Sequence, residues 1–191
     1  MGEIKKPLPV LLFIAAFSRD ENILRRGREM AEERFGRIHS ESTPFFVDDY
    51  TSYYQNEMGS ALIKRFWSFE KLIDPGELAG IKRETNGWEE RIAERFREEG
   101  GPARPLNLDP GYIDLGKFVL ASTKDHGHRI YLRDGIFAEI TLSYSQKRWQ
   151  ALPWTYADYK NEANQLFLTR CRDYLHSCRS NLHSCRGDLH R

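Results

Sequence analysis

The chain has 191 residues, of which 40% are hydrophobic and 13% aromatic, enough for one domain with a packed core. Its 29 lysines and arginines almost balance its 28 aspartates and glutamates, so the overall charge gives no strong signal for nucleic acid or for a membrane as partner. All three cysteines fall within the last 21 residues. No disulfide can therefore staple the body of the chain, which fits a reducing cytosol, and we expect a cytoplasmic protein.

The longest apolar run is VLLFIAAF at 10–17, far shorter than the roughly 20 residues of a membrane-spanning helix. With Lys5 and Lys6 before it, the run also imitates a short secretory signal. A capping box from Ser18 to Glu21 follows at once and indicates the start of a helix. This order favours a buried first strand over a signal.

Three helices and a second strand are expected before residue 107. Apolar residues at helical spacing predict an amphipathic helix from Ser18 until Gly36. Residues 42–50, STPFFVDDY, predict a strand that runs into a turn. Residues 53–73 predict a second helix and residues 85–99 a third, each closed by glycine and proline.

A β-hairpin is predicted after residue 127, because HRIYL and IFAEITLSY flank Arg133-Asp134-Gly135. A two-residue loop would bury Glu139 among apolar side chains, which is unfavourable for a lone carboxylate. We therefore predict a three-residue loop with a bulged glycine. The expected facing pairs are Leu132 with Ile136, Ile130 with Ala138, His128 with Ile140, Arg129 with Glu139 and Tyr131 with Phe137.

The chain ends in a repeat, since CRDYLHS, CRSNLHS and CRGDLHR begin at 171, 178 and 185. Each His follows its Cys by five residues, about 500° around a helix, so the two side chains face apart and no metal site is expected. Cysteine and leucine instead form a heptad seam. We expect a helix that begins near Tyr156 and projects beyond the body as a solvated extension, able to associate with a partner helix. Deleting 177–191 is then expected to leave the melting temperature nearly unchanged.

These elements predict an α+β fold. We expect a single domain over residues 1–170, with a largely antiparallel sheet and helices packed on one side of it. Residues 171–191 are expected to form the repeated helical tail.

Several separated motifs resemble those of a bacterial family, the domain of unknown function 4416. The resemblance runs from about Lys6 to Tyr174 and leaves out most of the repeated tail. It implies a small bacterial cytosolic protein, and some members carry the label of GTP-binding protein. The motifs are YYQNEMG, SFEKLIDP, NLDPGYIDLGKFVLASTKDHGHRIYLRDGIFAEITL and LPWTYADY.

Familiar catalytic and nucleotide-binding motifs are missing from the sequence. It contains no G-x-x-x-x-G-K-S/T loop and no G-x-G-x-x-G fingerprint, the motifs that cradle phosphates with consecutive backbone amides. It also lacks G-x-S-x-G, H-E-x-x-H and Cys-x-x-Cys. No cofactor is expected from these patterns.

The best site candidate is the segment 107–140, where small, charged and aromatic residues crowd together. We expect Lys124, Arg129 and Glu139 around one cavity mouth, with Asp109 or Tyr112 on the opposite lip. Three cations facing at most two carboxylates predict a preference for anions. The ligand-binding candidates are the cations Lys117, Lys124 and Arg129, the carboxylates Asp109 and Glu139, either of which could act as a base, and the rings of Tyr112 and Tyr131, which could stack on a ligand.

A scaffold interpretation stays open beside the site interpretation. Arg129 and Glu139 form an ordinary cross-strand pair in many hairpins. His128, on the apolar face, is expected to be a core histidine bonded to a backbone carbonyl, and His126 is expected to be solvated. Asp48 and Asp49 could form an acidic wall of the cleft or cap the helix that follows.

Two classes of function are compatible with the sequence. The first is an enzyme or binding protein that acts on an anionic, ring-bearing small molecule in a cleft near residues 107–140. The alternative is a non-enzymatic interaction module that binds a protein through exposed aromatics and the heptad tail. A deep pocket lined by the charged candidates favours the first, and a flat aromatic patch favours the second. The aromatics in question are Trp149, Trp154, Tyr156 and Tyr159.

Overall fold

The apolar run near the start of the chain is the central strand of the sheet, as its sequence predicts. The computed structural model describes residues 2–98 and 101–187, and Val10–Ser18 form β1, a strand whose nine residues are all buried. β4 pairs with one edge of β1 and β5 with the other, both antiparallel. Because β1 is apolar at nearly every position rather than at every second one, both of its faces need a cover.

The first half of the domain has the connectivity β-α-β-β-α-β. Its four central strands lie in the order β2-β4-β1-β5, the arrangement of the ferredoxin-like motif. The predicted first helix is confirmed, with Asp20 rather than Ser18 as its N-cap. After β1 the elements are α1 (Glu21–Phe35), β2 (Ile38–Glu41), β4 (Ile63–Ile73), α3 (Leu78–Glu98) and β5 (Asn107–Ile113).

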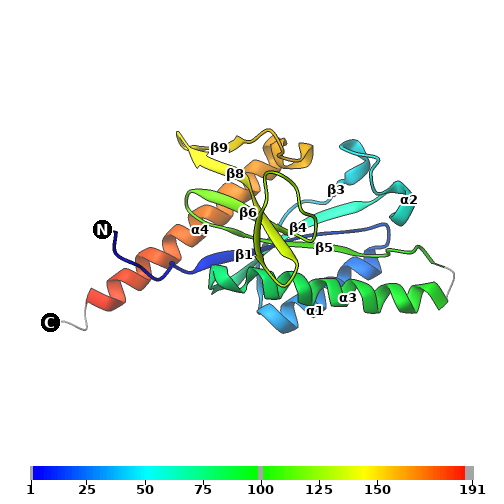
Figure 1. Ribbon diagram of the computed structural model, residues 1–191, viewed down its shortest axis with the longest axis horizontal. Coiled ribbons are helices and arrows are strands. Elements are labelled where there is room, and N and C mark those ends of the chain that lie inside the picture. Colours follow the sequence, from blue (N-terminus) through cyan, green and yellow to red (C-terminus); the bar gives the residue numbers. More distant parts are fainter. Residues whose placement is uncertain (1, 99–100, 188–191) are drawn as a thin grey trace.

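The second half extends the same sheet beyond β5. The strand path is β2-β4-β1-β5-β6-β8-β7, with β3 paired to β4 and β9 paired to β8 (Figure 1). Every described pairing is antiparallel, which confirms the α+β class. The remaining elements are β3 (Phe45–Phe46), α2 (Gln55–Met58), β6 (Lys117–Ser122), β7 (Ile130–Arg133), β8 (Ile136–Ser145), β9 (Arg148–Ala151) and α4 (Glu162–Gly187).

Helices cover both faces of the sheet, so the expectation that they pack on one side is wrong. Leu12 and Ile14 of β1 pack in one core cluster with residues of α1 and α3. Leu11 and Phe13 point to the opposite face and pack with α4. Figure 1 shows α4 away from α1 and α3, which lie together along the other side of the sheet. No helix in the described part of the chain is both long enough and apolar enough to cross a membrane.

The segment predicted as the second helix, 53–73, is mostly strand. It begins with the single turn of α2, which ends at Gly59 with a φ of +84°, and continues as β4. Leu62, Phe66, Phe69 and Ile73 have helical spacing, but pairing with β1 and β2 outweighs that pattern. The other boundaries before residue 107 also differ from prediction. The strand expected at 42–50 is reduced to β3 and a 3-10 turn, β2 was not predicted, and α3 begins at Leu78 rather than near 85.

The hairpin is confirmed, but its turn is tighter than predicted. Ile130 faces Ala138 and Tyr131 faces Phe137, as expected. The next pair is Arg133 with Ile136, so only Asp134 and Gly135, both with positive φ, form the loop. Tyr131 and Arg133 are two positions apart on β7, but their partners Phe137 and Ile136 are adjacent on β8. The extra residue is Leu132, so the bulge lies on the edge strand β7 and not at the glycine.

α4 belongs to the domain core over much of its length, so the expected boundary after residue 170 falls inside a packed helix. Cys171 and Leu175, the first members of the heptad seam, are fully buried against the sheet. Arg179 lies one turn further on, donates hydrogen bonds to the carbonyl of Pro9 and pairs with Asp114 at 2.8 Å. The predicted solvated projection is therefore wrong for residues 171–179. The later seam positions lie outside the residues whose side chains are described.

Candidate functional site

The sheet divides between β5 and β6, and this division creates the candidate site. The two strands pair from Ile113 with Phe118 to Gly111 with Leu120, and no further. A Cβ at Gly111 would lie 2.2 Å from the carbonyl oxygen of Val119, so only glycine permits this close approach. Pro110 comes next on β5 and has no N–H to continue the ladder.

Helix α3 replaces the missing strand along the free edge of β5. The Leu108 N–H donates to Oε1 of Glu89 at 2.7 Å, and the Leu108 carbonyl accepts from Nζ of Lys82 at 2.8 Å. Lys82 and Glu89 are seven residues apart and therefore lie on the same face of the helix. Both main-chain groups of Leu108 are thus satisfied by side chains, without closing the gap in the sheet.

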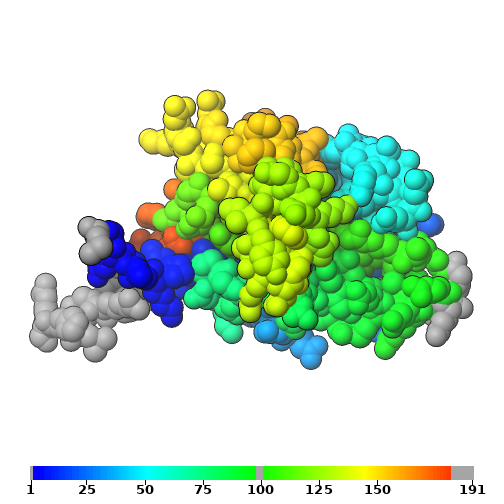
Figure 2. All heavy atoms as spheres, viewed as in Figure 1, coloured from blue at the N-terminus to red at the C-terminus, as the bar shows by residue number. Residues whose placement is uncertain are grey.

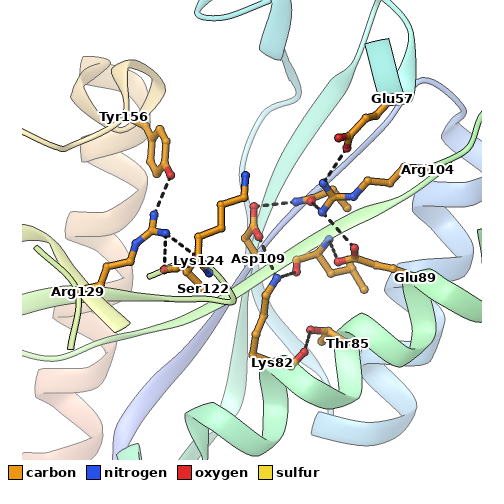
Figure 3. Close-up of polar contacts among 12 residues, drawn as sticks. Glu57, Lys82, Thr85, Glu89, Arg104, Asp109, Ser122, Lys124, Arg129 and Tyr156 are labelled. Atoms are coloured by element: carbon orange, nitrogen blue, oxygen red, sulfur yellow. Dashed lines mark hydrogen bonds and ion pairs between the residues drawn. The ribbon is translucent and has the colours of Figure 1, made fainter. Parts of the chain in front are cut away.

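A hydrogen-bonded network surrounds Asp109 at the bottom of this gap (Figure 3). Lys82 donates to Oδ1 of Asp109 at 3.1 Å, and Asn107 donates to Oδ2 at 2.7 Å. Nη2 of Arg104 donates hydrogen bonds to Oδ1 of Asn107 and to Oε2 of Glu89. Burial disfavours the charge on Asp109, but Lys82, Lys64 and these hydrogen bonds hold its pKa below the ordinary value.

Burial has the opposite outcome at the other carboxylate of the network. The pKa of Glu89 is raised by desolvation, which Lys82, Arg104 and the Leu108 amide oppose without cancelling. Arg104 loses hydration too, yet Glu89 and Asp109 raise the pKa of its guanidinium. Of Asp109 and Glu89, Asp109 is therefore the carboxylate that its surroundings hold in the charged form.

A cavity of about 1280 Å³ lies over the gap. Its walls come from α3, from the segment around α2, from the loop after β6 and from residues 156–159. Figure 2 shows these segments, coloured green, cyan, yellow-green and orange, meeting on one face of the molecule. The volume is that of a ligand pocket rather than of a packing defect.

A buried lysine forms the end of the cavity nearest α4. Nζ of Lys64 lies 2.6 Å from Oδ2 of Asp158, and both side chains are about nine-tenths buried. The same ammonium lies 5.0 Å from the ring centroid of Tyr159, with Phe17 and Phe66 at 5.3 and 5.6 Å. These rings and the carboxylate together compensate for the lost hydration of the lysine.

Two basic residues lie at the mouth of the cavity, with different roles. Nζ of Lys124 donates to the hydroxyl of Tyr53 at 2.6 Å and lies 4.7 Å from that ring, and no described carboxylate pairs with it. Arg129 is committed to the protein, because its guanidinium donates to Glu139, Ser122 Oγ, the Lys124 carbonyl and the Tyr156 hydroxyl. Lys124 can therefore meet a ligand anion without giving up an ion pair, unlike Arg129.

The structure brings together four of the seven predicted site residues. Asp109, Lys124, Arg129 and Glu139 all line the cavity, as the sequence predicts. The other three predicted residues do not line it. Lys117 faces Ser143 at the far end of β6, Tyr112 packs against the core under α1 and α3, and Tyr131 lies on the exposed edge strand beside Phe137.

The predicted charge balance of the cavity is wrong. Three cations were expected against at most two carboxylates, but Lys64, Lys82, Arg104 and Arg129 each have a carboxylate partner. His128 is also not the expected core histidine, since it contacts Oε2 of Glu139 at 3.1 Å and stacks on Trp154. His126 is exposed, as predicted.

Sequence reasoning missed much of the inner site, including Lys64, Lys82, Glu89 and Arg104. A signal existed in α3, where Lys82, Thr85 and Glu89 are polar residues beside the apolar stripe of Ile81, Trp88 and Ile92. Lys82 is only 4% exposed, so this side of the helix is buried despite its polar sequence. For Lys64 the helical interpretation of 53–73 concealed that it shares a strand face with Phe66.

The aromatics of the alternative hypothesis do not form one exposed patch. Trp149 and Tyr159 are 4% and 1% exposed and belong to the core, while Tyr156 is exposed and Trp154 is half-buried. The expectation that all four are exposed is wrong for Trp149 and Tyr159, because β9 and the 3-10 turn at 157–160 pack onto α4.

Comparison with known proteins identifies one family. The family model described as domain of unknown function (DUF4416) matches residues 8–174, nearly the whole domain. No curated protein and no solved structure shows significant similarity to the chain.

Proposed function

Since the chain belongs to the DUF4416 family, whose description states no activity, we propose a function from its cavity: it binds a small molecule that carries an anionic group and a ring. The cavity is large enough for such a ligand, and its walls combine charged groups with tyrosine rings. A pocket of this kind is the feature that separates small-molecule binding from the alternative of a protein-interaction module. The burial of Trp149 and Tyr159 leaves that alternative with less support.

Lys124 is the single observation that carries the proposal. Its ammonium lies at the cavity mouth, has a tyrosine hydroxyl as its hydrogen-bond partner, and pairs with no described carboxylate. A phosphate or carboxylate of a ligand would gain a charge-assisted hydrogen bond there without breaking an ion pair. The exposed ring of Tyr53, whose hydroxyl accepts the hydrogen bond of the ammonium, leaves its face available for a ligand ring.

A nucleotide such as GTP combines these two features, which agrees with the label that some members of the family carry. The sequence has no glycine-rich G-x-x-x-x-G-K-S/T loop, so binding would rest on side chains. We also propose a cytoplasmic location, supported by the unpaired thiols of Cys171 and Cys178.

Isothermal titration with GTP, guanosine, phenyl phosphate and inorganic phosphate tests the proposal. We expect at least one ring-bearing anion to bind more tightly than guanosine and than phosphate alone. The variant Lys124→Met should weaken that binding by about tenfold or more with an unchanged melting temperature. Lys117→Met is the matched control, since the structure places this lysine away from the cavity. Equal effects of the two substitutions, or no binding of any anion, would contradict the proposal.

A further inference from the structure

The inner end of the cavity contains a tyrosine hydroxyl that the protein leaves without a partner. The ring of Tyr159 is 1% exposed and packs between Phe13, Phe66 and Phe118. Its hydroxyl forms no hydrogen bond with another described residue. It is not sealed in the core either, because the buried side-chain atoms without a partner in the described part belong to four other residues. Tyr159 lines the cavity, so this hydroxyl is directed into it.

Tyr54 provides a second hydroxyl of the same kind. Its ring packs on Phe17 with centroids 4.8 Å apart, and the residue lines the cavity. No described residue forms a hydrogen bond with its hydroxyl. Burial, and then the charge of Asp109, raise the pKa of Tyr54, while burial, Asp158 and Asp109 raise the pKa of Tyr159. Both phenols therefore stay protonated and able to donate.

Asp109 supplies an acceptor beside these donors. Each of its carboxylate oxygens accepts one hydrogen bond from the protein, from Lys82 or from Asn107, and keeps a free lone pair. The side chain is 29% exposed, on the side that lines the cavity. The hydroxyl of Tyr156 accepts a bond from Arg129 and retains its own proton for donation. The inner end thus presents the carboxylate of Asp109 as an acceptor beside the hydroxyl donors of Tyr54 and Tyr159, while Tyr156 adds a donor nearer the mouth, where it is bonded to Arg129.

We propose that this inner end recognises the hydroxyl groups of a sugar ring, so that the ligand is a sugar phosphate, either free or within a nucleotide. A sugar hydroxyl both donates and accepts, and it can therefore donate to Asp109 while it accepts from Tyr54 or Tyr159. An aromatic ring without hydroxyls would leave these groups unsatisfied in a largely buried place, which opposes its binding. The phosphate then lies toward Lys124 at the mouth. The inference rests on the proposed function and specifies its ligand class.

Titration with three phosphates tests the inference: ribose 5-phosphate, guanosine 5′-monophosphate and phenyl phosphate. We expect at least one of the two sugar phosphates to bind about tenfold or more tightly than phenyl phosphate. Tyr159→Phe and Tyr54→Phe should each lower the affinity for that sugar phosphate by about tenfold and leave the affinity for phenyl phosphate unchanged. Tyr144→Phe, which removes a hydroxyl outside the cavity, is the control and should alter neither.

The outcomes separate this inference from the proposed function. If phenyl phosphate binds as tightly as both sugar phosphates and Lys124→Met still weakens it, the site is an anion site and the sugar assignment is wrong. If none of the three binds, the sugar assignment is wrong, whereas the proposed function fails only if GTP does not bind either. If guanosine 5′-monophosphate binds tightly and ribose 5-phosphate does not bind, the ligand is a nucleotide. If ribose 5-phosphate binds tightly and the monophosphate does not, the ligand is a free sugar phosphate. Neither substituted hydroxyl has a partner among the described residues, so neither variant is expected to lose stability.

Discussion

Nε of Arg129 lies 2.8 Å from Oε2 of Glu139, and the two side chains are only 4% and 2% exposed. The pair connects the start of β7 to the middle of β8, and the same guanidinium holds the main chain at Lys124. Glu139 is the carboxylate that the sequence could not accommodate in a two-residue hairpin. Its burial is tolerated because both carboxylate oxygens have partners. Arg129 and His128 contact Oε2, and the hydroxyl of Thr141 donates to Oε1.

The first prediction concerns this buried pair. Arg129→Ala leaves Glu139 buried and without its guanidinium, so we expect the free energy of unfolding to fall by about 3–5 kcal/mol. Urea denaturation measures the loss, with Arg37→Ala as control, since the pair of Arg37 with Glu70 is long and exposed. A loss below about 1 kcal/mol would show that the pair is not buried as described.

The second prediction tests whether α3 substitutes for a strand at the edge of β5. Lys82→Met retains the volume of the side chain but removes the donor for the Leu108 carbonyl and the cation beside Asp109. We expect a loss of about 3 kcal/mol in the free energy of unfolding. Adding Asp109→Asn should recover part of it, because the uncompensated charge is then gone. Arg83→Met, one residue further on an exposed side of the helix, should change stability by less than about 0.5 kcal/mol.

The third prediction follows from the lowered pKa of Asp109. A carboxyl whose pKa is lower in the folded than in the unfolded protein stabilises the fold above its unfolded pKa, and this contribution disappears as the pH falls through the folded value. The wild type should therefore exceed Asp109→Asn in unfolding free energy at neutral pH, and the difference should shrink below about pH 4. Denaturant titrations of both proteins from neutral to acid pH measure this. A difference that stays constant over the whole range contradicts an ionised Asp109.

The sequence predicted the fold class and one half of the site because local patterns determine both. β1 was predicted from its apolar run, the hairpin from Asp134-Gly135, and Lys124 with Arg129 from their place around it. The inner half depends on contacts between distant segments, since Lys64, Lys82 and Asp109 are each about 20 residues or more apart in the chain. Pro110 is the only local sign that β5 and β6 separate on the N-terminal side of Gly111, and that separation is what exposes Asp109 to the cavity.

The fourth prediction concerns the part of the repeated segment that packs as core. Leu175 is fully buried against the sheet, so Leu175→Ala should lower the free energy of unfolding by about 2–5 kcal/mol. Deleting 177–191 removes Arg179 and its bonds to Pro9 and Asp114, and the melting temperature should fall as well, contrary to the expectation for a solvated extension. His176→Ala, on the exposed side of the same helix, is the control. An unchanged melting temperature after the deletion would instead support the expectation that these residues form a solvated extension.

The last prediction uses the cysteines of the seam, of which the structure describes Cys171 as buried and Cys178 as half-buried. Burial raises the pKa of the Cys171 thiol to about 12, an effect that a hydrogen bond with Ser68 only partly opposes. The thiol is thus protonated and inaccessible at pH 8, where maleimides react with exposed cysteines. In the variant Cys178→Ser with Cys185→Ser, N-ethylmaleimide should modify Cys171 only after unfolding, as followed by mass spectrometry. The complementary variant that retains Cys178 should react in the native state, because this side chain is half-buried near the helix surface. Rapid native modification of Cys171 would mean that α4 leaves the sheet easily, and the reaction rate would then give the free energy of that opening.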